Sequence, residues 1–381
     1  MKPTNISMTS VLRRITLLSI FACSVSLAIE EGQELATKDQ IMAVLLINGK
    51  SAEMEANGTG FACTYKNREF VATNLHVIGG ASVITVRPQS GGNIPLSGAM
   101  IVAEDADICL LGIKGNFSDI GITPLEFMED VFKGAKAGDE IVCLGNSLGN
   151  GVISTTTGTI KAFGQPRLEI ESPVVQGNSG GPIIHRPTGK VVGLVTEAEV
   201  NEEKTNPLVL AAKRSKDSTL REISYFGHRV DAVQKWKGSS VADYEKAGRE
   251  IDGVEIGLNR TLMFFADEDG WEKDRRLADA WRIYSAFIEK AAAKTTRRVE
   301  VTNYVNEYGF VVRSDSRVRG NSVNQADFDK ARETFCRSVE WKIHAEQEIL
   351  KKAKPIGFRQ AEKVRDLKDF SNLVLALQKQ L

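Results

Sequence analysis

Short apolar runs alternate with turn residues from about residue 43 to residue 233. The runs are a few residues long, and the breaks between them contain Gly, Pro, Asn and Asp. This pattern is typical of antiparallel strands joined by tight turns, and a succession of such strands closes into β-barrels. We therefore predict a mostly β domain over residues 40–236.

Apolar residues after Trp236 recur at helical spacing instead. One stripe lies within residues 275–294, another lies within residues 325–354, and residues 363–381 are a third amphipathic candidate. Such stripes form the core of a helical bundle more often than a groove for a partner. We predict an α-helical region over residues 237–381, which could pack on the barrels, mediate homo-oligomerisation or hold a substrate or adaptor protein. The stripe residues are Leu277, Trp281, Tyr284, Ile288, Phe328, Phe335, Val339, Ile343 and Leu350.

The first residues have the features of an export signal. Basic residues, among them Arg13 and Arg14, precede an apolar stretch and the small residues of Ser26-Leu27-Ala28. Residues 1–28 are thus predicted to be a signal peptide cleaved after about Ala28, which implies a periplasmic or secreted product. The apolar stretch is too short for a stable transmembrane anchor. A lipoprotein acylated at Cys23 is the lesser alternative.

Composition narrows the classes of partner and cofactor. The chain has 381 residues, 42% of them hydrophobic, with 49 basic and 49 acidic residues, so it can bury a sizeable core and lacks the basic surplus that nucleic acid binding needs. The four cysteines after the predicted signal show no C-x-x-C spacing, and no H-E-x-x-H is present, so no metal site is expected. Buried free thiols are the default, although an oxidising compartment would allow a disulfide. These cysteines are Cys63, Cys109, Cys143 and Cys336.

The stretch Gly177-Asn178-Ser179-Gly180-Gly181-Pro182 carries the clearest indication of chemistry. A serine among glycines is typical of a reactive nucleophile on a tight turn, because residues without Cβ let the backbone approach an incoming carbonyl. The N–H groups of Gly177 and Ser179 would then form an oxyanion hole. A short motif can also be an incidental turn, so this interpretation requires a base and an acid elsewhere.

Both partners occur upstream. His76 follows the β-prone run from Phe70 and stands just before a Gly-Gly turn, so we expect it at a strand end. A lone histidine is more often structural, but the serine motif favours a catalytic base. Asp107 directly precedes a buried apolar run, where its carboxylate could hold the imidazole Nδ1–H. Asp105 is the competing candidate, and Asp107 is preferred because it abuts the predicted strand.

The order His76, Asp107, Ser179 is that of chymotrypsin-type proteases. With these residues in place, the chain resembles the HtrA/Deg branch of the trypsin-like serine proteases over roughly residues 40–235. The motifs that carry the resemblance are Gly58-Thr59-Gly60-Phe61, Ala72-Thr73-Asn74-Leu75-His76-Val77, Asp107-Ile108-Cys109-Leu110-Leu111, Leu144-Gly145-Asn146-Ser147-Leu148-Gly149, Thr157-Gly158-Thr159-Ile160-Lys161-Ala162 and the turn from Gly177 to Pro182.

The resemblance implies two antiparallel six-stranded β-barrels with the site between them. His76 and Asp107 would come from the first barrel, Ser179 from the second, and a linker over residues 117–130 would join the two. In this family a PDZ domain commonly follows the protease, yet nothing after residue 235 resembles its carboxylate-binding loop. Asn178 replaces the aspartate that digestive enzymes pair with a new N-terminus, so activation by N-terminal cleavage is not expected.

The resulting hypothesis is a serine endopeptidase that cleaves exported or misfolded polypeptides through an acyl-enzyme intermediate, without metal or organic cofactor. The alternative is a non-catalytic pseudoprotease or chaperone-like binding module. By resemblance, Pro173, Val174, Thr196 and Ala198 line the pocket for the side chain before the scissile bond. No carboxylate stands at the position of Pro173, and Glu197 is expected at the rim.

Overall fold

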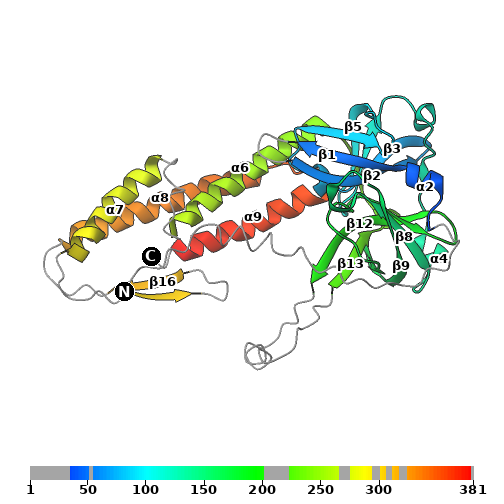
Figure 1. The fold of residues 1–381 in the computed structure, drawn as a ribbon. Helices are drawn as coiled ribbons and strands as arrows, with labels where there is room; N and C mark the ends of the chain where they lie inside the picture. Colours follow the sequence, from blue (N-terminus) through cyan, green and yellow to red (C-terminus); the bar gives the residue numbers. More distant parts are fainter. Residues whose placement is uncertain are drawn as a thin grey trace, which may run out of the picture. The chain divides into compact units, whose positions relative to one another are not determined.

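Two β-sheet units and four long helices form most of the described structure (Figure 1). The computed structural model describes residues 35–50, 55–200, 223–265, 275–293, 301–305, 311–316 and 324–378, and residues 35–381 make one compact unit. The predicted signal peptide and Cys23 lie outside the described residues. Within them, no helix has the length and apolar character needed to span a bilayer.

The second β unit is the closed six-stranded barrel that was expected. Its strands are all antiparallel and follow the order β10-β13-β12-β11-β8-β9. Alternating apolar residues such as Ile141, Ile160 and Val192 point into its core. The strands are β8 (Glu140–Gly145), β9 (Ser154–Phe163), β10 (Arg167–Glu171), β11 (Pro182–His185), β12 (Val191–Val200) and β13 (Ile223–His228).

The first β unit differs from the expected six-stranded barrel. It is an eight-stranded sheet of order β14-β5-β6-β3-β2-β1-β4, with β7 parallel to β2. Closure would require β4 to pair with the outer edge of β5, but β14 occupies that edge from Trp236 opposite Ala103 to Ser240 opposite Ala99. The strands are β1 (Val44–Lys50), β2 (Glu55–Tyr65), β3 (Arg68–Thr73), β4 (Val83–Pro88), β5 (Leu96–Ala103), β6 (Cys109–Ile113), β7 (Leu125–Glu126) and β14 (Trp236–Ser240).

The segment expected as a linker does join the two units. It contains a short 3₁₀ helix, η1 (Phe117–Ile120), and strand β7, which pairs with β2 of the first sheet. Phe127 then forms a bridge with Val191 of β12, and Met128 N–H donates to Val191 O at 2.9 Å. The linker therefore contacts both β units.

The region after β14 holds helices α6 (Val241–Phe265), α7 (Arg275–Ala293), α8 (Gln325–Lys352) and α9 (Gly357–Gln378). Helices α7 and α8 agree with the predicted ranges, whereas α9 starts six residues earlier than expected and α6 was not predicted. A two-stranded hairpin of β15 (Val301–Val305) and β16 (Val311–Ser316) adds strand structure to a region expected to be helical. Strand β14 also crosses the predicted domain boundary at residue 236.

The predicted apolar stripes form a helical core. Leu277 of α7 and Phe335, Val339 and Ile343 of α8 are buried in one cluster. The Trp281 ring lies 5.7 Å from that of Phe335, centroid to centroid. The prediction of a helical core is confirmed for these residues, whereas Ile288 of the same stripe in α7 is 39% exposed.

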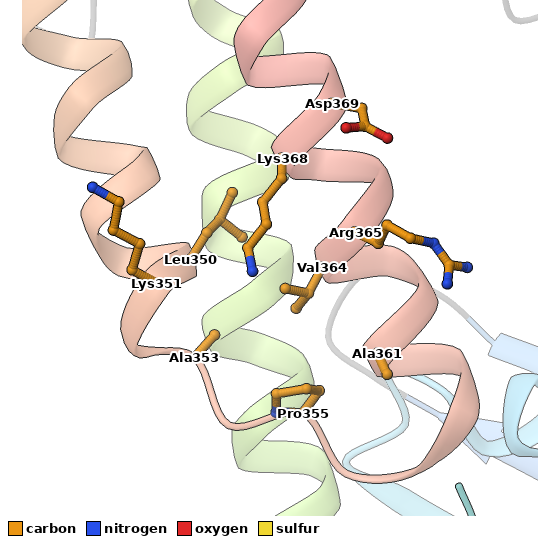
Figure 2. Close-up of a pocket in the computed structure, with 9 residues that line it drawn as sticks. All are labelled: Leu350, Lys351, Ala353, Pro355, Ala361, Val364, Arg365, Lys368 and Asp369. Atoms are coloured by element: carbon orange, nitrogen blue, oxygen red, sulfur yellow. The ribbon is translucent and has the colours of Figure 1, made fainter. Parts of the chain in front are cut away.

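A surface pocket lies where α8 turns into α9 (Figure 2). Leu350, Pro355 and Val364 provide apolar lining, and Lys351 and Lys368 lie at its edge. None of the site residues expected from the sequence lines this pocket.

Helices α6 and α9 pack against the first β unit at the short helix α3 (Leu75–Ile78). The buried Tyr244 of α6 donates its hydroxyl to Leu75 O at 3.3 Å. Gln360 of α9 donates from Nε2 to Tyr244 O at 2.7 Å. The first turn of α9 is thereby held beside the segment that carries His76.

Candidate active site

His76 lies on the one-turn helix α3 rather than at the end of a strand. Strand β3 ends at Thr73, and Asn74 adopts extended backbone angles as the N-cap. Val77 N–H donates to Asn74 O at 3.3 Å, and this hydrogen bond closes the helical turn that contains His76. The β-prone sequence through Val77 therefore predicted a longer strand than the structure has.

Asp107 is the acidic partner of His76. Its Oδ2 lies 2.6 Å from His76 Nδ1, and its Oδ1 accepts the His76 backbone N–H at 3.1 Å. Asp105 points elsewhere, because its Oδ2 accepts the Gln234 N–H at 2.9 Å. The structure therefore brings together the preferred acid and the expected base.

The backbone of Asp107 is fixed on both sides. Its N–H donates to His228 Nδ1 at 2.7 Å, and its carbonyl accepts from Asn74 Nδ2 at 2.6 Å. The side chain is fully buried. Burial opposes ionisation, but the hydrogen bond and charge of His76, followed by those of Arg359, hold the pKa of the Asp107 carboxyl below its usual range.

Arg359 of α9 is an unexpected member of this group. Its Nε donates to Asp107 Oδ2 at 2.8 Å, the same oxygen that contacts His76. Its Nη1 donates to Glu362 Oε2 at 3.0 Å. No local motif surrounds Arg359, so its position could not be inferred from a sequence pattern.

The Ser179 turn packs directly against the first β unit. Gly180 has φ of +85°, and a Cβ there would meet Thr59 O and Thr73 Oγ1 and come within 3.2 Å of Asn74 N. Only glycine fits this approach without strain. Thr59 N–H also donates to Ser179 O at 2.9 Å. The Ser179 turn therefore lies beside the segment that leads into His76.

The hydroxyl of Ser179 donates to the backbone carbonyl of Thr196 at 3.2 Å. Among the described residues, no hydrogen bond joins Ser179 Oγ to the His76 ring. His76 is about a third exposed, with 34% of its side-chain surface accessible. The ring is therefore accessible to solvent and to a substrate.

The expected oxyanion-hole residues lie on the same turn. Gly177 has φ of +94°, and the peptide carbonyl of Gln176 before it accepts the Leu148 N–H at 2.7 Å. In the part of the chain that the structure describes, neither the Gly177 N–H nor the Ser179 N–H has a hydrogen-bond acceptor. Asn178 is buried and accepts from Ser147 Oγ at 2.8 Å, which fixes the residue between the two donors.

The expected pocket residues are not equally buried. Thr196 is buried, Val174 is half-buried, and Pro173 and Ala198 are exposed. The side chain of Glu197 lies outside the described residues. Thr196 is the pocket residue that contacts Ser179, through its backbone carbonyl.

Two further side chains near the site were missed in the sequence. Burial is the largest cause that lowers the pKa of His228 to about 4, so its ring is neutral near pH 7 and Nδ1 can accept from Asp107. Thr59 accepts the Asn146 N–H at 2.8 Å and donates to Gly177 O at 2.6 Å. The motif around Thr59 was noted, but neither contact could be derived from it.

The described residues contain no group of three or more His, Cys, Asp or Glu side chains placed to hold a metal ion. The four cysteines after the predicted signal are free, and burial raises the pKa of the Cys143 thiol to about 12. Each of these cysteines is therefore in its thiol form near pH 7.

Residues 58–194 match the family model described as the trypsin-like peptidase domain. These residues form a trypsin-like peptidase domain, which is similar to the domains of HtrA/Deg proteases. A "Probable periplasmic serine endoprotease DegP-like" of Pseudomonas fluorescens is 29% identical over 155 residues, 38% of this chain and 30% of that protein. The "Periplasmic serine endoprotease DegP" of Salmonella typhimurium is 29% identical over 140 residues, 33% of this chain and 27% of that protein.

The trypsin-like domain also has similar solved structures. The serine endoprotease from Yersinia pestis is 24% identical, covers 48% of this chain and 66% of its own, and has a TM-score of 0.36. The HtrA-type protease AlgW with tripeptide is 18% identical, covers 51% of this chain and 60% of its own, and has a TM-score of 0.38. The matched segments span about a third of the length of these DegP relatives.

Proposed function

We propose that this chain is a serine endopeptidase in which Ser179 is the nucleophile, His76 the general base and Asp107 the residue that orients His76. The observation that carries the proposal is the 2.6 Å contact between His76 Nδ1 and Asp107 Oδ2 beside the tightly packed Ser179 turn. A buried carboxylate on Nδ1 leaves Nε2 as the ring nitrogen that accepts a proton.

The reaction follows from these roles. Ser179 Oγ attacks the peptide carbonyl carbon while His76 Nε2 takes the hydroxyl proton, and the carbonyl oxygen gains negative charge. The N–H groups of Gly177 and Ser179 would donate to that oxygen. His76 then gives its proton to the leaving amine, the acyl-enzyme forms, and water hydrolyses it by the same sequence.

A modest change prepares Ser179 for attack. In the resting arrangement its hydroxyl donates to Thr196 O. Rotation of the hydroxyl toward His76 replaces one hydrogen bond with another, and catalytic hydrogen bonds often tighten only when substrate is bound. Substrate binding is therefore expected to complete the contact between Ser179 and His76.

The substrates we propose are exported or misfolded polypeptides, and the compartment is the periplasm or the exterior. Support comes from the periplasmic DegP relatives and from the zero net charge, which gives no basic surplus for nucleic acid. The proposal assigns residues 40–236 to the protease and residues 237–381 to an extension that contributes Arg359 to the site.

Ser179→Ala tests the proposed function. We expect the variant to lose cleavage of casein, with at most a residual of ~10³ to 10⁴ over water from the oxyanion hole and binding. Its melting temperature should stay close to that of the wild type, because the lost hydroxyl makes one partly buried bond. Equal cleavage by both proteins would overturn the assignment, and no cleavage by the wild type would favour the binding-module alternative.

A further inference from the structure

A histidine ring nitrogen and a guanidinium nitrogen contact the same carboxylate oxygen. Asp107 Oδ2 lies 2.6 Å from His76 Nδ1 and 2.8 Å from Arg359 Nε. Asp107 precedes β6 in the first β unit, whereas Arg359 belongs to the first turns of α9, 252 residues later in the chain. The helical region therefore reaches the acid of the proposed triad directly.

The contact from Arg359 is not needed to place Asp107. His76 N–H already donates to its Oδ1 at 3.1 Å, and the Asp107 backbone is held by His228 and Asn74. The first of these hydrogen bonds holds the carboxylate and the other two hold the backbone, all without help from α9. What Arg359 adds is a positive charge on the oxygen that His76 uses.

That charge opposes the step in which His76 becomes positive. In the proposed reaction the His76 ring passes from neutral to cationic, and Asp107 stabilises the cation. A guanidinium on the same oxygen partly neutralises the carboxylate and repels the imidazolium. The carboxylate that both groups contact is fully buried, which strengthens these interactions relative to those between fully exposed groups. Arg359 is therefore expected to raise the barrier to proton uptake by His76.

We propose that Arg359 acts through Asp107 to lower the activity of the triad while the first turn of α9 is docked. The inference rests on the proposed function. The helical extension is thus an internal regulator of the same site, because it holds the protease in a state of reduced activity. Withdrawal of the Arg359 guanidinium from Asp107 would restore full activity.

The structure contains a second partner for a withdrawn guanidinium. Arg359 Nη1 already donates to Glu362 Oε2 at 3.0 Å. The Arg359 side chain is 31% exposed. Its guanidinium can therefore leave Asp107 and remain hydrated and paired, without the cost of an unpaired buried charge. Glu362 is also 31% exposed and could keep the ion pair after the contact with Asp107 is broken.

The docked turn itself has specific contacts. Gly357 has φ of +75°, and a Cβ there would lie 3.1 Å from Leu75 Cδ1. The Phe358 ring packs edge-on against His228 at 6.2 Å between centroids. Gln360 bonds to Tyr244 of α6. A ligand or partner that displaces this turn would therefore move Arg359 as well.

Several other titratable groups face this trio, and none of them changes in the variants compared below. They are Glu362 of α9, Tyr244 of α6, Cys109 of β6 and His228 at the end of β13, and His228 in turn interacts with Arg167 of β10.

Arg359→Gln is the decisive variant. It removes the charge and keeps a hydrogen-bond donor, so we expect the plateau kcat/KM on a peptide substrate to rise about fivefold, and the midpoint of the acid limb to move to higher pH by roughly half a unit or more. Arg359→Lys keeps the charge and should stay within about twofold of the wild type.

Arg365→Gln is the matched control. Arg365 lies on the same helix, is exposed, and its guanidinium points away from α8 (Figure 2). We expect no change in rate or in the acid limb. Melting curves of all variants establish that each one is folded. A lower or unchanged plateau in folded Arg359→Gln, or an unmoved acid limb, would overturn the inference.

A readout without turnover separates this inference from the proposed function. In a Ser179→Ala background, NMR titration of the His76 ring should show its protonation midpoint at higher pH when Arg359→Gln is added. An unchanged midpoint would overturn the inference even if the wild type is an active protease. A shifted midpoint in a chain without Ser179-dependent activity would support the charge coupling and contradict the proposed function.

Discussion

Thr59 of the first β unit is hydrogen-bonded to Gly177 of the Ser179 turn in the second. Thr59 Oγ1 donates to Gly177 O at 2.6 Å and accepts the Asn146 N–H at 2.8 Å. Its side chain is fully buried. One hydroxyl thus fixes the orientation of the peptide that follows Gly177.

Thr59→Val should destabilise the protein and lower its activity. The valine has nearly the same shape, but it leaves Gly177 O and Asn146 N without their partner, and an unsatisfied buried group costs about 1–3 kcal/mol. Denaturant unfolding and casein cleavage measure the two effects. Thr59→Ser keeps the hydroxyl and is the control. A valine variant as stable and active as the serine variant would show that the hydroxyl has no such role.

His228 should make stability depend on pH. Burial is the main reason that its pKa is lowered to about 4 in the folded chain, against about 6.5 for a histidine in water. Between these values the unfolded chain binds more protons, so the free energy of unfolding should fall as pH drops from about 6.5 to about 4, by ~2–3 kcal/mol.

His228→Gln isolates this contribution. The glutamine can still accept the Asp107 N–H through Oε1, but it does not titrate. Chemical denaturation at several pH values between 4 and 7 should therefore show a shallower decline in the variant than in the wild type. Carboxylates titrate in both proteins, so their contributions to the pH dependence of the free energy of unfolding cancel in the comparison. Parallel curves for the two proteins would refute the assigned role of burial.

Cleavage should favour small or medium aliphatic residues before the scissile bond. The expected pocket contains Pro173, Val174, Thr196 and Ala198 and no carboxylate among their side chains. An aliphatic side chain gains about 1.5–3 kcal/mol on full burial, whereas an unpaired buried cation loses several kcal/mol of hydration. Sequencing of products from a denatured protein digest measures the preference. A majority of cuts after Lys or Arg would contradict it and would implicate Glu197.

Local motifs were sufficient to predict the central pairing of the site. Asp107 was preferred over Asp105 because it abuts a strand, and the structure places it on His76. The glycine turn around Ser179 was predicted from residues without Cβ, and Gly180 adopts the positive φ that such a turn requires. Both features are determined by residues adjacent in the sequence, which is why they could be predicted from it.

The long-range features could not be predicted in the same way. Arg359 reaches Asp107 because α9 packs on α3. In the sequence it is one charged residue of an amphipathic helix, and such residues are ordinarily solvated, so no contact with Asp107 was expected. The first sheet remained open because β14 returned to pair with β5. Helix α6 was missed because Gly248, Gly253 and Gly257 weaken its helical pattern, while burial of Ile251 and Leu258 stabilises it.

The central claim is that Ser179 is an activated nucleophile, and covalent labelling tests it most directly. A fluorophosphonate reacts with a serine only where a base removes its proton, so the wild type should be labelled and Ser179→Ala should not be. Proteolytic mapping by mass spectrometry should place the adduct on the peptide that contains Ser179. Absence of labelling in the folded wild type, or an adduct on another residue, would contradict the account.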